Sequence, residues 1–261
     1  MKIITITSDL GNKGSYLASL KGSIYSQIDN VRIVDIDNEI DPFNIQQGAF
    51  ILQNCYKNFP KGTIHIISID DELSINNEHI AAYIDGHFFI GADNGFFSLF
   101  LANIAPEKIV KLNINQTSDV MTFAAKNIFS VAACHLARGG TMEIIGTKVE
   151  KLENIKSKLS PIVKKDLLQG SVIFTDTYGN AITNISKDIF NNACKGRSFS
   201  ILFGREDETI SVISNKYKDV PLAEKLALFT ESNYLQIAIN QGKASELLGL
   251  SMYEIIRIEF K

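Results

Sequence analysis

Two aspartates follow predicted buried strands, and their placement suggests a ligand site. Asp9 follows a β-branched run that begins at Lys2, and Asp70 follows a second such run, Thr63 to Ile69. Parallel strands bring their carboxyl ends to one edge of a sheet, and ligands of open α/β sheets bind at that edge. A carboxylate there can accept two hydrogen bonds from a ribose diol. On this stretch alone, Asp9 is equally well explained as a turn former in the glycine-flanked loop after its strand.

A second polar stretch, residues 175–185, lies between apolar segments later in the chain. Asp176 can pair with an ammonium group, and the amides of Asn180 and Asn184 offer donors and acceptors to a small polar ligand. A tight turn whose Asp and Asn side chains bond their own backbone explains the same residues. The sequence leaves open whether this stretch is a binding loop or a structural turn.

The elements around Asp9 and Asp70 alternate between strands and helices. Apolar runs predict the strands, and the spacing of apolar residues predicts the helices. The predicted strands are the run from residue 2 and residues 31–35, 63–69 and 108–114, the predicted helices are 15–28, 45–58 and 127–137, and Asp85-Gly86 predicts a hairpin between 80–84 and 88–90. We therefore expect an N-terminal Rossmann-like α/β domain over residues 1–150.

The second half of the chain has a different pattern of apolar and polar residues. Residues 151–169 belong to a lysine-rich stretch with little periodicity, which we interpret as a linker, although a basic surface patch explains the same composition. From residue 170 onward, short apolar runs follow at close spacing, which is typical of a small barrel or sandwich. These runs are 171–174, 199–203, 210–213, 225–229, 235–239 and 255–260. We expect a C-terminal β-barrel-like domain over residues 170–261.

Composition argues against several classes of protein. The formal net charge is −3 with interspersed signs, which disfavours nucleic acid as a partner. No apolar run approaches the roughly 20 residues of a membrane span, and Met1 leads directly into strand residues without a signal peptide, so we expect a cytoplasmic protein. Cys55, Cys134 and Cys194 are far apart, which indicates buried free thiols. The histidines are equally scattered, so we expect no metal site.

Short motifs with a specific joint order extend across nearly the whole chain. They are Ser8-Asp9-Leu10-Gly11, Leu20-Lys21-Gly22, Asp41-Pro42-Phe43, Gly48-Ala49-Phe50, Phe59-Pro60-Lys61-Gly62-Thr63, Ala92-Asp93-Asn94-Gly95, Asp176 through Ile185, and Ser232-Asn233-Tyr234-Leu235. In these motifs the chain resembles the S-adenosyl-L-methionine hydroxide adenosyltransferase family, which also contains the fluorinase and chlorinase enzymes. The resemblance implies an α/β domain, a smaller β-barrel-like domain, and a homotrimer with each site between neighbouring subunits.

The resemblance also implies roles for individual residues. Asp9 would hold the ribose hydroxyls and Phe43 would pack beside the sugar. Asp176 and Ser232 would bind the methionine end, and the segment near Asn240 would bind adenine. The substrate-binding residues expected on this basis are Asp9, Phe43, Asp176, Tyr178, Asn180, Ser232, Asn233, Asn240 and Gly242.

The reaction of the family is displacement at the 5′ carbon of the adenosyl group. Its hydrolases resemble one another in an Asp, Arg and His set that activates water. Here Asp70 matches the Asp, but Asn77 and Ala124 stand where the Arg and His are expected. His79, nearby in an expected exposed loop, can pair with Asp70 or remain solvated.

We expect an enzyme that hydrolyses S-adenosyl-L-methionine to adenosine and L-methionine without a cofactor. The alternative is a catalytically impaired protein that binds or senses an adenosyl nucleoside, because Asn77 and Ala124 replace two activating residues.

Overall fold

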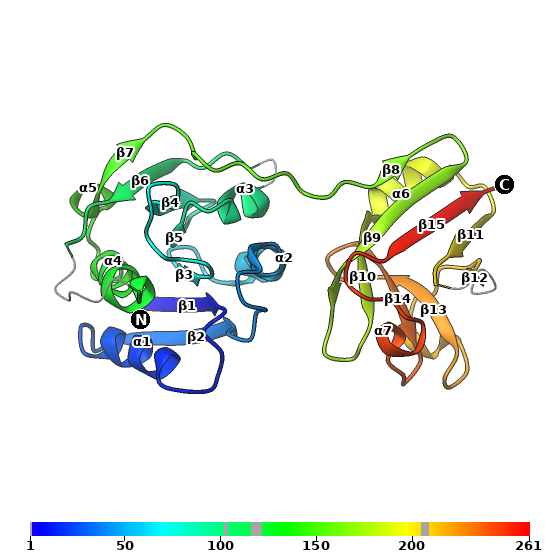
Figure 1. The fold of residues 1–261 in the computed structure, drawn as a ribbon, viewed down its shortest axis with the longest axis horizontal. Coiled ribbons are helices and arrows are strands. Elements are labelled where there is room, and N and C mark those ends of the chain that lie inside the picture. Colours follow the sequence, from blue (N-terminus) through cyan, green and yellow to red (C-terminus); the bar gives the residue numbers. More distant parts are fainter. Residues whose placement is uncertain (1, 102–103, 116–121, 205–208) are drawn as a thin grey trace. The chain divides into compact units, whose positions relative to one another are not determined.

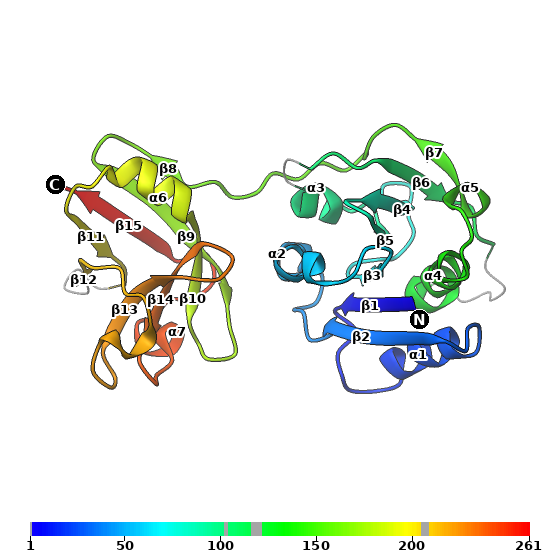
Figure 2. The ribbon, with the colours of Figure 1, turned by 180° about the vertical axis from the view of Figure 1, so that it is seen from behind.

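The computed structural model describes residues 2–101, 104–115, 122–204 and 209–261. The chain divides into two compact units, Met1–Lys158 and Leu159–Lys261. Figures 1 and 2 show a mixed α/β fold in the first unit and a mainly β fold in the second. Within the described ranges, no helix combines the length and apolar character needed to cross a membrane.

The first unit is built on a seven-stranded mixed sheet in the order β2-β1-β3-β5-β4-β6-β7. Its strands are β1 (Lys2–Ser8), β2 (Val31–Asp37), β3 (Ile64–Ser68), β4 (His79–Ile84), β5 (His87–Ala92), β6 (Lys108–Leu112) and β7 (Gly146–Val149). Strands β2, β1, β3 and β5 are parallel neighbours, whereas the pairs formed by β4, β6 and β7 are antiparallel. The loops after β1, β3 and β5 therefore leave the sheet at the same edge.

Helices cover both faces of this sheet. They are α1 (Tyr16–Tyr25), α2 (Ile45–Cys55), the 3₁₀ turn η1 (Tyr56–Asn58), α3 (Phe96–Leu101), the π-helix η2 (Ala125–Phe129), α4 (Ser130–Ala137) and α5 (Met142–Ile145). One core packs α1, η2 and α4 against residues such as Ile4 and Ile66, and the other packs α2 and α3 against Ile67 and Phe89. Burial on both faces explains the unbroken apolar runs, because each buried large side chain contributes roughly 1.5–3 kcal/mol.

The predicted strands and the hairpin of the first unit are confirmed. The helices differ at their ends. The predicted helix 15–28 ends at Tyr25, and the predicted helix 45–58 ends as a 3₁₀ turn from Tyr56. The predicted helix 127–137 begins earlier, as a π-helix from Ala125, because Ala125, Ile128 and Phe129 all enter the core there.

The second unit contains an antiparallel sheet in the order β12-β11-β15-β9-β10-β14-β13, with β8 beside β9. Its elements are β8 (Ile162–Val163), β9 (Leu167–Thr175), β10 (Ala181–Ser186), α6 (Lys187–Cys194), β11 (Phe199–Leu202), β12 (Thr209–Ile210), the 3₁₀ turn η3 (Tyr217–Asp219), β13 (Lys225–Phe229), β14 (Tyr234–Ile239), α7 (Ala244–Leu247) and β15 (Ile255–Phe260). A bridge between Ile213 and Ala227 brings the two ends of the sheet together. The sheet is thus nearly barrel-shaped.

The lysine-rich stretch expected to be a linker forms specific contacts over much of its length. The backbone amides of Glu153 and Asn154 donate to the Asp93 carboxylate, at 2.7 and 3.5 Å. The backbone amide of Lys156 donates to Ser98 at 2.9 Å. Farther along, Ile162–Val163 pairs with β9, which begins at Leu167.

Candidate functional site

The carboxyl edge of the first sheet gathers polar groups from three loops. The Asp9 amide donates to the carbonyl of Ser68 at 3.1 Å, which ties the loop after β1 to the end of β3. The side chain of Asn94, after β5, donates to the carbonyls of Ile69 and Asp70 at 2.9 and 3.0 Å. The structure therefore brings Asp9 and Asp70, both predicted from the sequence, to one edge of the sheet.

Asp9 also holds the backbone at Phe43. Its Oδ2 accepts a hydrogen bond from the Phe43 amide at 3.0 Å. Phe43 is 72% exposed and has a φ of +66°, a left-handed conformation that is strained for a bulky residue. One carboxylate oxygen of Asp9 is therefore occupied by a hydrogen bond within the protein. The ring of Phe43 is exposed to solvent close to the loop that carries Asp9.

Asp70 is held by its backbone and not by its side chain. Its φ is +47°, a left-handed conformation that aspartate tolerates better than most residues. Its carbonyl accepts the amide groups of Asn77 and Asn94, each at 3.0 Å. The residue is exposed, and its carboxylate has no hydrogen-bond partner within the described part of the chain. This carboxylate is free to accept a proton or a hydrogen bond from a bound molecule.

Asn77 and Ala124, the two departures from the family pattern, have structural roles. The Asn77 amide donates to Asp70 and also to the Glu72 carbonyl at 2.9 Å. Ala124 is 0% exposed and belongs to the core beneath the sheet. Neither residue can supply a positive charge to the edge.

Asp71 lies just inside the edge and has a perturbed acidity. The pKa of its carboxyl is raised to about 6, chiefly by burial and also by the negative charges of Asp9 and Asp70, although a hydrogen bond from Ser68 Oγ at 2.7 Å opposes the rise. The expectation of an exposed loop at His79 is wrong. His79 begins β4, is 3% exposed, and bonds the Asp71 carbonyl through Nε2 at 2.8 Å. Burial lowers the pKa of this imidazole.

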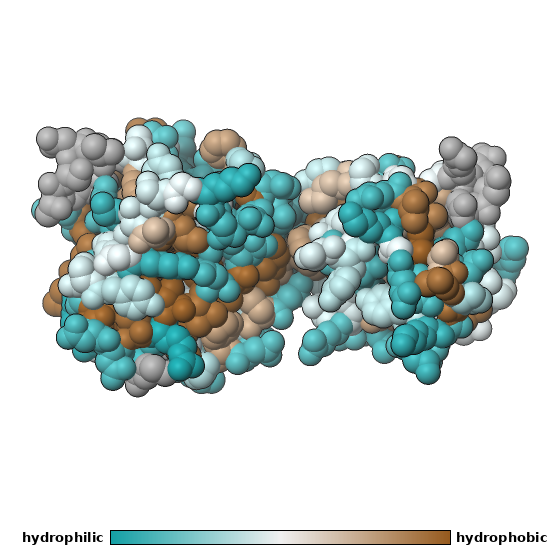
Figure 3. Space-filling model, turned by 90° about the horizontal axis from the view of Figure 1, so that it is seen from below, coloured by the Kyte–Doolittle hydropathy of each residue, from teal (hydrophilic) through white to brown (hydrophobic). Residues whose placement is uncertain are grey.

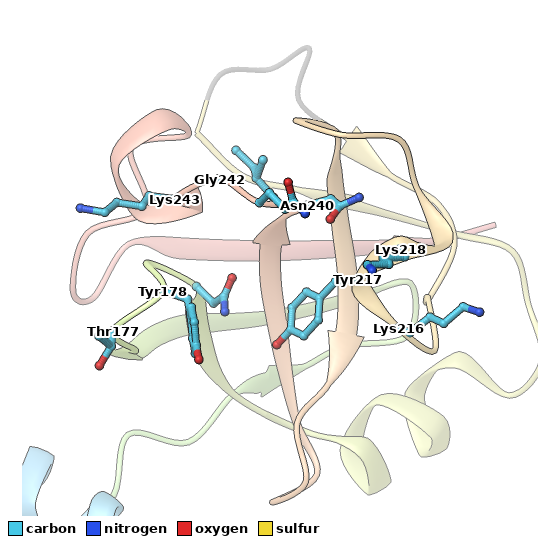
Figure 4. Close-up of a pocket in the computed structure, with 11 residues that line it drawn as sticks. Thr177, Tyr178, Lys216, Tyr217, Lys218, Asn240, Gly242 and Lys243 are labelled. Carbon is cyan, nitrogen blue, oxygen red and sulfur yellow. The ribbon is translucent and has the colours of Figure 1, made fainter.

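A pocket of about 830 Å³ lies at one end of the second sheet. It is lined by Thr177, Tyr178, Asn180, Lys216, Tyr217, Lys218, Ile239, Asn240, Gln241, Gly242 and Lys243. Figure 4 shows the rings of Tyr178 and Tyr217 at the pocket, with the ammonium groups of Lys216 and Lys243 pointing away from it. Four of the predicted binding residues, Tyr178, Asn180, Asn240 and Gly242, are thus brought together.

Asp176 shapes the loop beside this pocket. Its Oδ1 accepts the backbone amides of Tyr178 and Asn180 at 3.0 and 2.9 Å. Its Oδ2 accepts the side-chain amides of Asn180 and Gln236 at 2.9 and 3.3 Å. The turn interpretation of this stretch therefore describes Asp176, while Asn180 both joins the turn and lines the pocket. The third polar candidate, Asn184, is buried in β10 and bonds the backbone of Ser171 and Leu159.

The far side of the pocket depends on close backbone packing after β14. Asn240 is buried, and its amide donates to the carbonyls of Val220 and Pro221 at 2.8 and 3.3 Å. A Cβ at Gly242 would lie 2.6 Å from Ile239 Cγ2, which is too close for any other residue without a local shift. This segment is therefore specified by packing as well as by hydrogen bonding.

Ser232 and Asn233 lie away from the pocket. They occupy the turn before Tyr234, whereas the pocket lies after Ile239, so the length of β14 separates them, roughly 15–20 Å at the usual rise per residue. Asn233 has a φ of +62°, and its carbonyl accepts the amide of Lys187. Both side chains are exposed.

Among the lining residues that sequence reasoning missed, Tyr217 joins the pocket to a hydrogen-bond network beneath it. The Tyr217 hydroxyl donates to Gln236 Oε1 at 3.2 Å, and the amide of Gln236 in turn donates to Asp176. Gln236 is 2% exposed. A buried glutamine in an otherwise apolar strand is a signal that could have pointed to this network, because a buried amide requires partners.

No group of three or more His, Cys, Asp or Glu residues that could hold a metal occurs among the residues the structure describes. Two of the scattered histidines form a buried pair instead. His65 bonds Thr5 at 2.7 Å and His87 at 3.2 Å. Burial, followed by the influence of His87, lowers the pKa of His65 to about 3.

Comparison with known proteins covers almost the whole chain. A "(R)-S-adenosyl-L-methionine hydrolase" of Methanocaldococcus jannaschii is 26% identical over 99% of this chain and 96% of its own length. A "Fluorinase" of Actinopolyspora mzabensis is 22% identical over 74% of this chain and 75% of its own. The crystal structure of an uncharacterized conserved protein from Thermotoga maritima superposes with a TM-score of 0.89 and 25% identity, and covers 98% of this chain and 99% of its own.

Two family models divide the sequence between them. The SAM hydroxide adenosyltransferase N-terminal domain matches residues 4–146, and the corresponding C-terminal domain matches residues 170–257. SAM denotes S-adenosyl-L-methionine. Together the two matches span the carboxyl edge of the first sheet and the pocket of the second unit. The chain belongs to the SAM hydroxide adenosyltransferase family.

Proposed function

We propose that this protein hydrolyses SAM to adenosine and L-methionine. The observation that carries the proposal is the exposed carboxylate of Asp70 next to the loop of Asp9, in a chain matched along its length by family members named as SAM hydrolases. A carboxylate fixed by its backbone and free at its oxygens is suited to orient a water molecule.

The proposed reaction is an in-line displacement. The water oxygen forms a bond to the 5′ carbon as the bond from that carbon to the sulfonium sulfur breaks, and the bonding pair stays on sulfur. The leaving group is the neutral thioether of methionine, so it needs neither an acid nor a cofactor. The proton lost by water passes to the Asp70 carboxylate and then to solvent. The contribution of the protein is chiefly orientation, with electrostatic support.

We assign the ribose to Asp9 and the adenine to the pocket of the second unit. Asp9 has one oxygen bonded to the Phe43 amide, which leaves the other for a ribose hydroxyl. At the pocket, the amide nitrogen of Asn180 is bonded to Asp176, so its Oδ1 is the atom that remains to accept a hydrogen bond from an amino group. The rings of Tyr178 and Tyr217 offer apolar surface to a base.

The remaining predicted residues are assigned more indirectly. We propose that Phe43 packs against the sugar, because its ring is exposed near Asp9. Ser232 and Asn233 would contact the methionine end, at the opposite end of β14 from the adenine pocket. Asp176 acts through the loop that it holds, since both of its oxygens already accept hydrogen bonds.

The test is incubation of the purified protein with SAM, followed by chromatographic detection of adenosine and L-methionine. Equimolar release of both, well above a sample of the Asp70→Asn variant, is expected. Binding of adenosine in a calorimeter without release of adenosine from SAM would contradict the proposal and indicate a protein that binds an adenosyl nucleoside.

We also propose a Rossmann-like topology for the first unit and a homotrimeric assembly. Four adjacent parallel strands with helices on both faces support the first. Figure 3 shows apolar side chains on the surface, and Ile75, Ile144 and Ile155 are 88%, 75% and 70% exposed, which supports contacts between copies. Light scattering after size exclusion should give three times the mass of 28.9 kDa.

A further inference from the structure

The loop that carries Asp70 has no glycine at its left-handed position. The sequence after β3 is Ile69-Asp70-Asp71-Glu72-Leu73, without glycine or proline. Asp70 nevertheless adopts a φ of +47°. A non-glycine residue in this region persists only where surrounding contacts hold it. Something outside the local sequence must therefore fix the backbone at Asp70.

Two side-chain amides converge on the backbone of Asp70. The Asn94 amide nitrogen lies 3.0 Å from the Asp70 carbonyl oxygen and 2.9 Å from that of Ile69. The Asn77 amide nitrogen lies 3.0 Å from the same Asp70 oxygen and 2.9 Å from that of Glu72. Carbonyls on both sides of Asp70, together with its own, are thus held by two donors.

Both donors are themselves anchored. The Oδ1 of Asn94 accepts the amide of Phe96 at 3.0 Å, which fixes Asn94 to the start of α3. The backbone of Asn77 exchanges two hydrogen bonds with Ser74, at 3.1 and 3.3 Å. The side chain of Asn154 donates to the carbonyl of Asn76 at 2.9 Å and braces the same loop from outside. The two amides are therefore rigid supports.

We propose that Asn94 and Asn77 are positioning residues for the Asp70 carboxylate. They hold Asp70 in its left-handed conformation and so direct its oxygens toward the bound water. This inference rests on the proposed function. It also gives Asn77 a task that differs from that of the arginine expected at its position: it fixes the carboxylate through the backbone and brings no charge.

The variant Asn94→Asp separates this role from simple support of the loop. It is isosteric and retains an acceptor for the Phe96 amide, but it replaces the donor to Ile69 and Asp70 with an acceptor. Asn94→Ala removes the donor without adding charge. Asn76→Asp is the matched control, because it adds the same charge to the same region and the Asn76 side chain makes no hydrogen bond to the described residues.

The measurements are kcat for adenosine release from SAM and the Kd of adenosine by calorimetry. Displacement of a reacting group by about 1 Å can reduce a rate by about 10²-fold, so we expect kcat to fall by about 10–100-fold in Asn94→Asp and Asn94→Ala. The Kd for adenosine should stay within about twofold, and Asn76→Asp should resemble the unchanged protein. An unchanged kcat, or a loss confined to Kd, would overturn the inference.

A crystal structure of Asn94→Asp supplies a readout that does not depend on activity. Asp70 should leave the left-handed region in this variant. If the unchanged protein releases no adenosine, the proposed hydrolysis fails, and the conformation of Asp70 in this crystal structure still decides whether the two amides hold it. An Asp70 that keeps a φ near that of the unchanged protein would overturn the positioning role.

Discussion

Asp70 and Asp176 are both aspartates in loops next to predicted ligand sites, but their surroundings use them in opposite ways. Asp70 gives its backbone carbonyl to Asn77 and Asn94 and leaves its carboxylate exposed. Asp176 accepts four hydrogen bonds through its carboxylate. The same side chain is thus exposed in one unit, where we propose that it activates water, and is part of the scaffold in the other. The comparison predicts that substitutions at the two positions affect different measurements.

The largest expected effect is on the rate of hydrolysis after Asp70→Asn. The neutral amide cannot take the proton from water, so kcat should fall by about 10²–10³-fold, the usual effect of losing a group that acts directly on the reacting atoms. The free energy of unfolding should change by no more than about 0.5 kcal/mol, because the exposed carboxylate makes no contact that the amide would lose. Initial rates of adenosine release and urea unfolding check the two halves.

If Asp70→Asn releases adenosine at a rate near that of the unchanged protein, the Asp70 carboxylate does not activate water, and the contrast with Asp176 fails. Water activation would then have to be sought at another carboxylate of this edge, such as Asp9 or Asp71.

Asp71 tests how much ionisation of a further carboxyl group at this edge of the sheet lowers the free energy of unfolding. Its pKa is raised from 3.8 to about 6, so the folded state holds its proton more tightly than the unfolded state. The resulting stabilisation is fully present below pH about 4 and is lost as the pH rises through 6, and a shift of this size corresponds to about 3 kcal/mol. The difference in unfolding free energy between the unchanged protein and Asp71→Asn should fall by about this amount between pH 4 and 7.

Urea unfolding at several pH values measures that difference directly, since titrations common to both proteins cancel. A difference that is flat across this range would mean that the carboxyl of Asp71 is neither buried nor repelled by Asp9 and Asp70 as the structure indicates.

Asp176→Asn should reverse the pattern expected for Asp70. The new amide would place a donor against the donating amides of Asn180 and Gln236, which now bond Oδ2. Loss of hydrogen bonds to a charged group costs roughly 1.5–3 kcal/mol, so we expect the free energy of unfolding to fall by about 2–3 kcal/mol. Adenosine affinity should weaken as well, because the loop that presents Asn180 loses its support. Full stability with reduced binding would instead indicate direct contact between Asp176 and the ligand.

The sequence predicted the strands well and the individual contacts less well. Runs such as Ile3 to Thr7 are apolar or β-branched throughout because both faces of the first sheet are covered, and that physical reason is local to the run. His79 was expected in an exposed loop, since the acidic residues before it carry no strand pattern. The structure begins β4 at this residue, where its ring packs against Phe129.

The candidate site was predictable only where motif and topology agreed. The position of Asp9 and Asp70 at one edge follows from parallel strands, so residue order was enough. The contacts of Asn77 could not be predicted, because they depend on the left-handed turn at Asp70. No glycine in the sequence indicates such a turn at this position. Tyr217 was missed for a similar reason: its partner Gln236 lies 19 residues away, and only the pairing of strands in the second unit brings them together.

The smallest expected effect separates the two tyrosines of the pocket. Tyr217→Phe removes the hydroxyl that bonds Gln236 and keeps the ring. Because that bond helps to hold the ring at the pocket, adenosine binding should weaken by at most roughly 0.5–1 kcal/mol, the net value of one neutral hydrogen bond. Tyr178→Phe is the matched control, because the Tyr178 side chain is 78% exposed and its hydroxyl bonds none of the described residues. Its effect should stay within a few tenths of a kcal/mol.

Calorimetric titration with adenosine resolves the two values. Equal losses of adenosine affinity in the two variants would mean that both hydroxyls contact the ligand directly and that the hydrogen bonds from Tyr217 through Gln236 to Asp176 add nothing to recognition. A loss of affinity confined to Tyr217→Phe would mean that these hydrogen bonds to the Asp176 carboxylate support ligand binding.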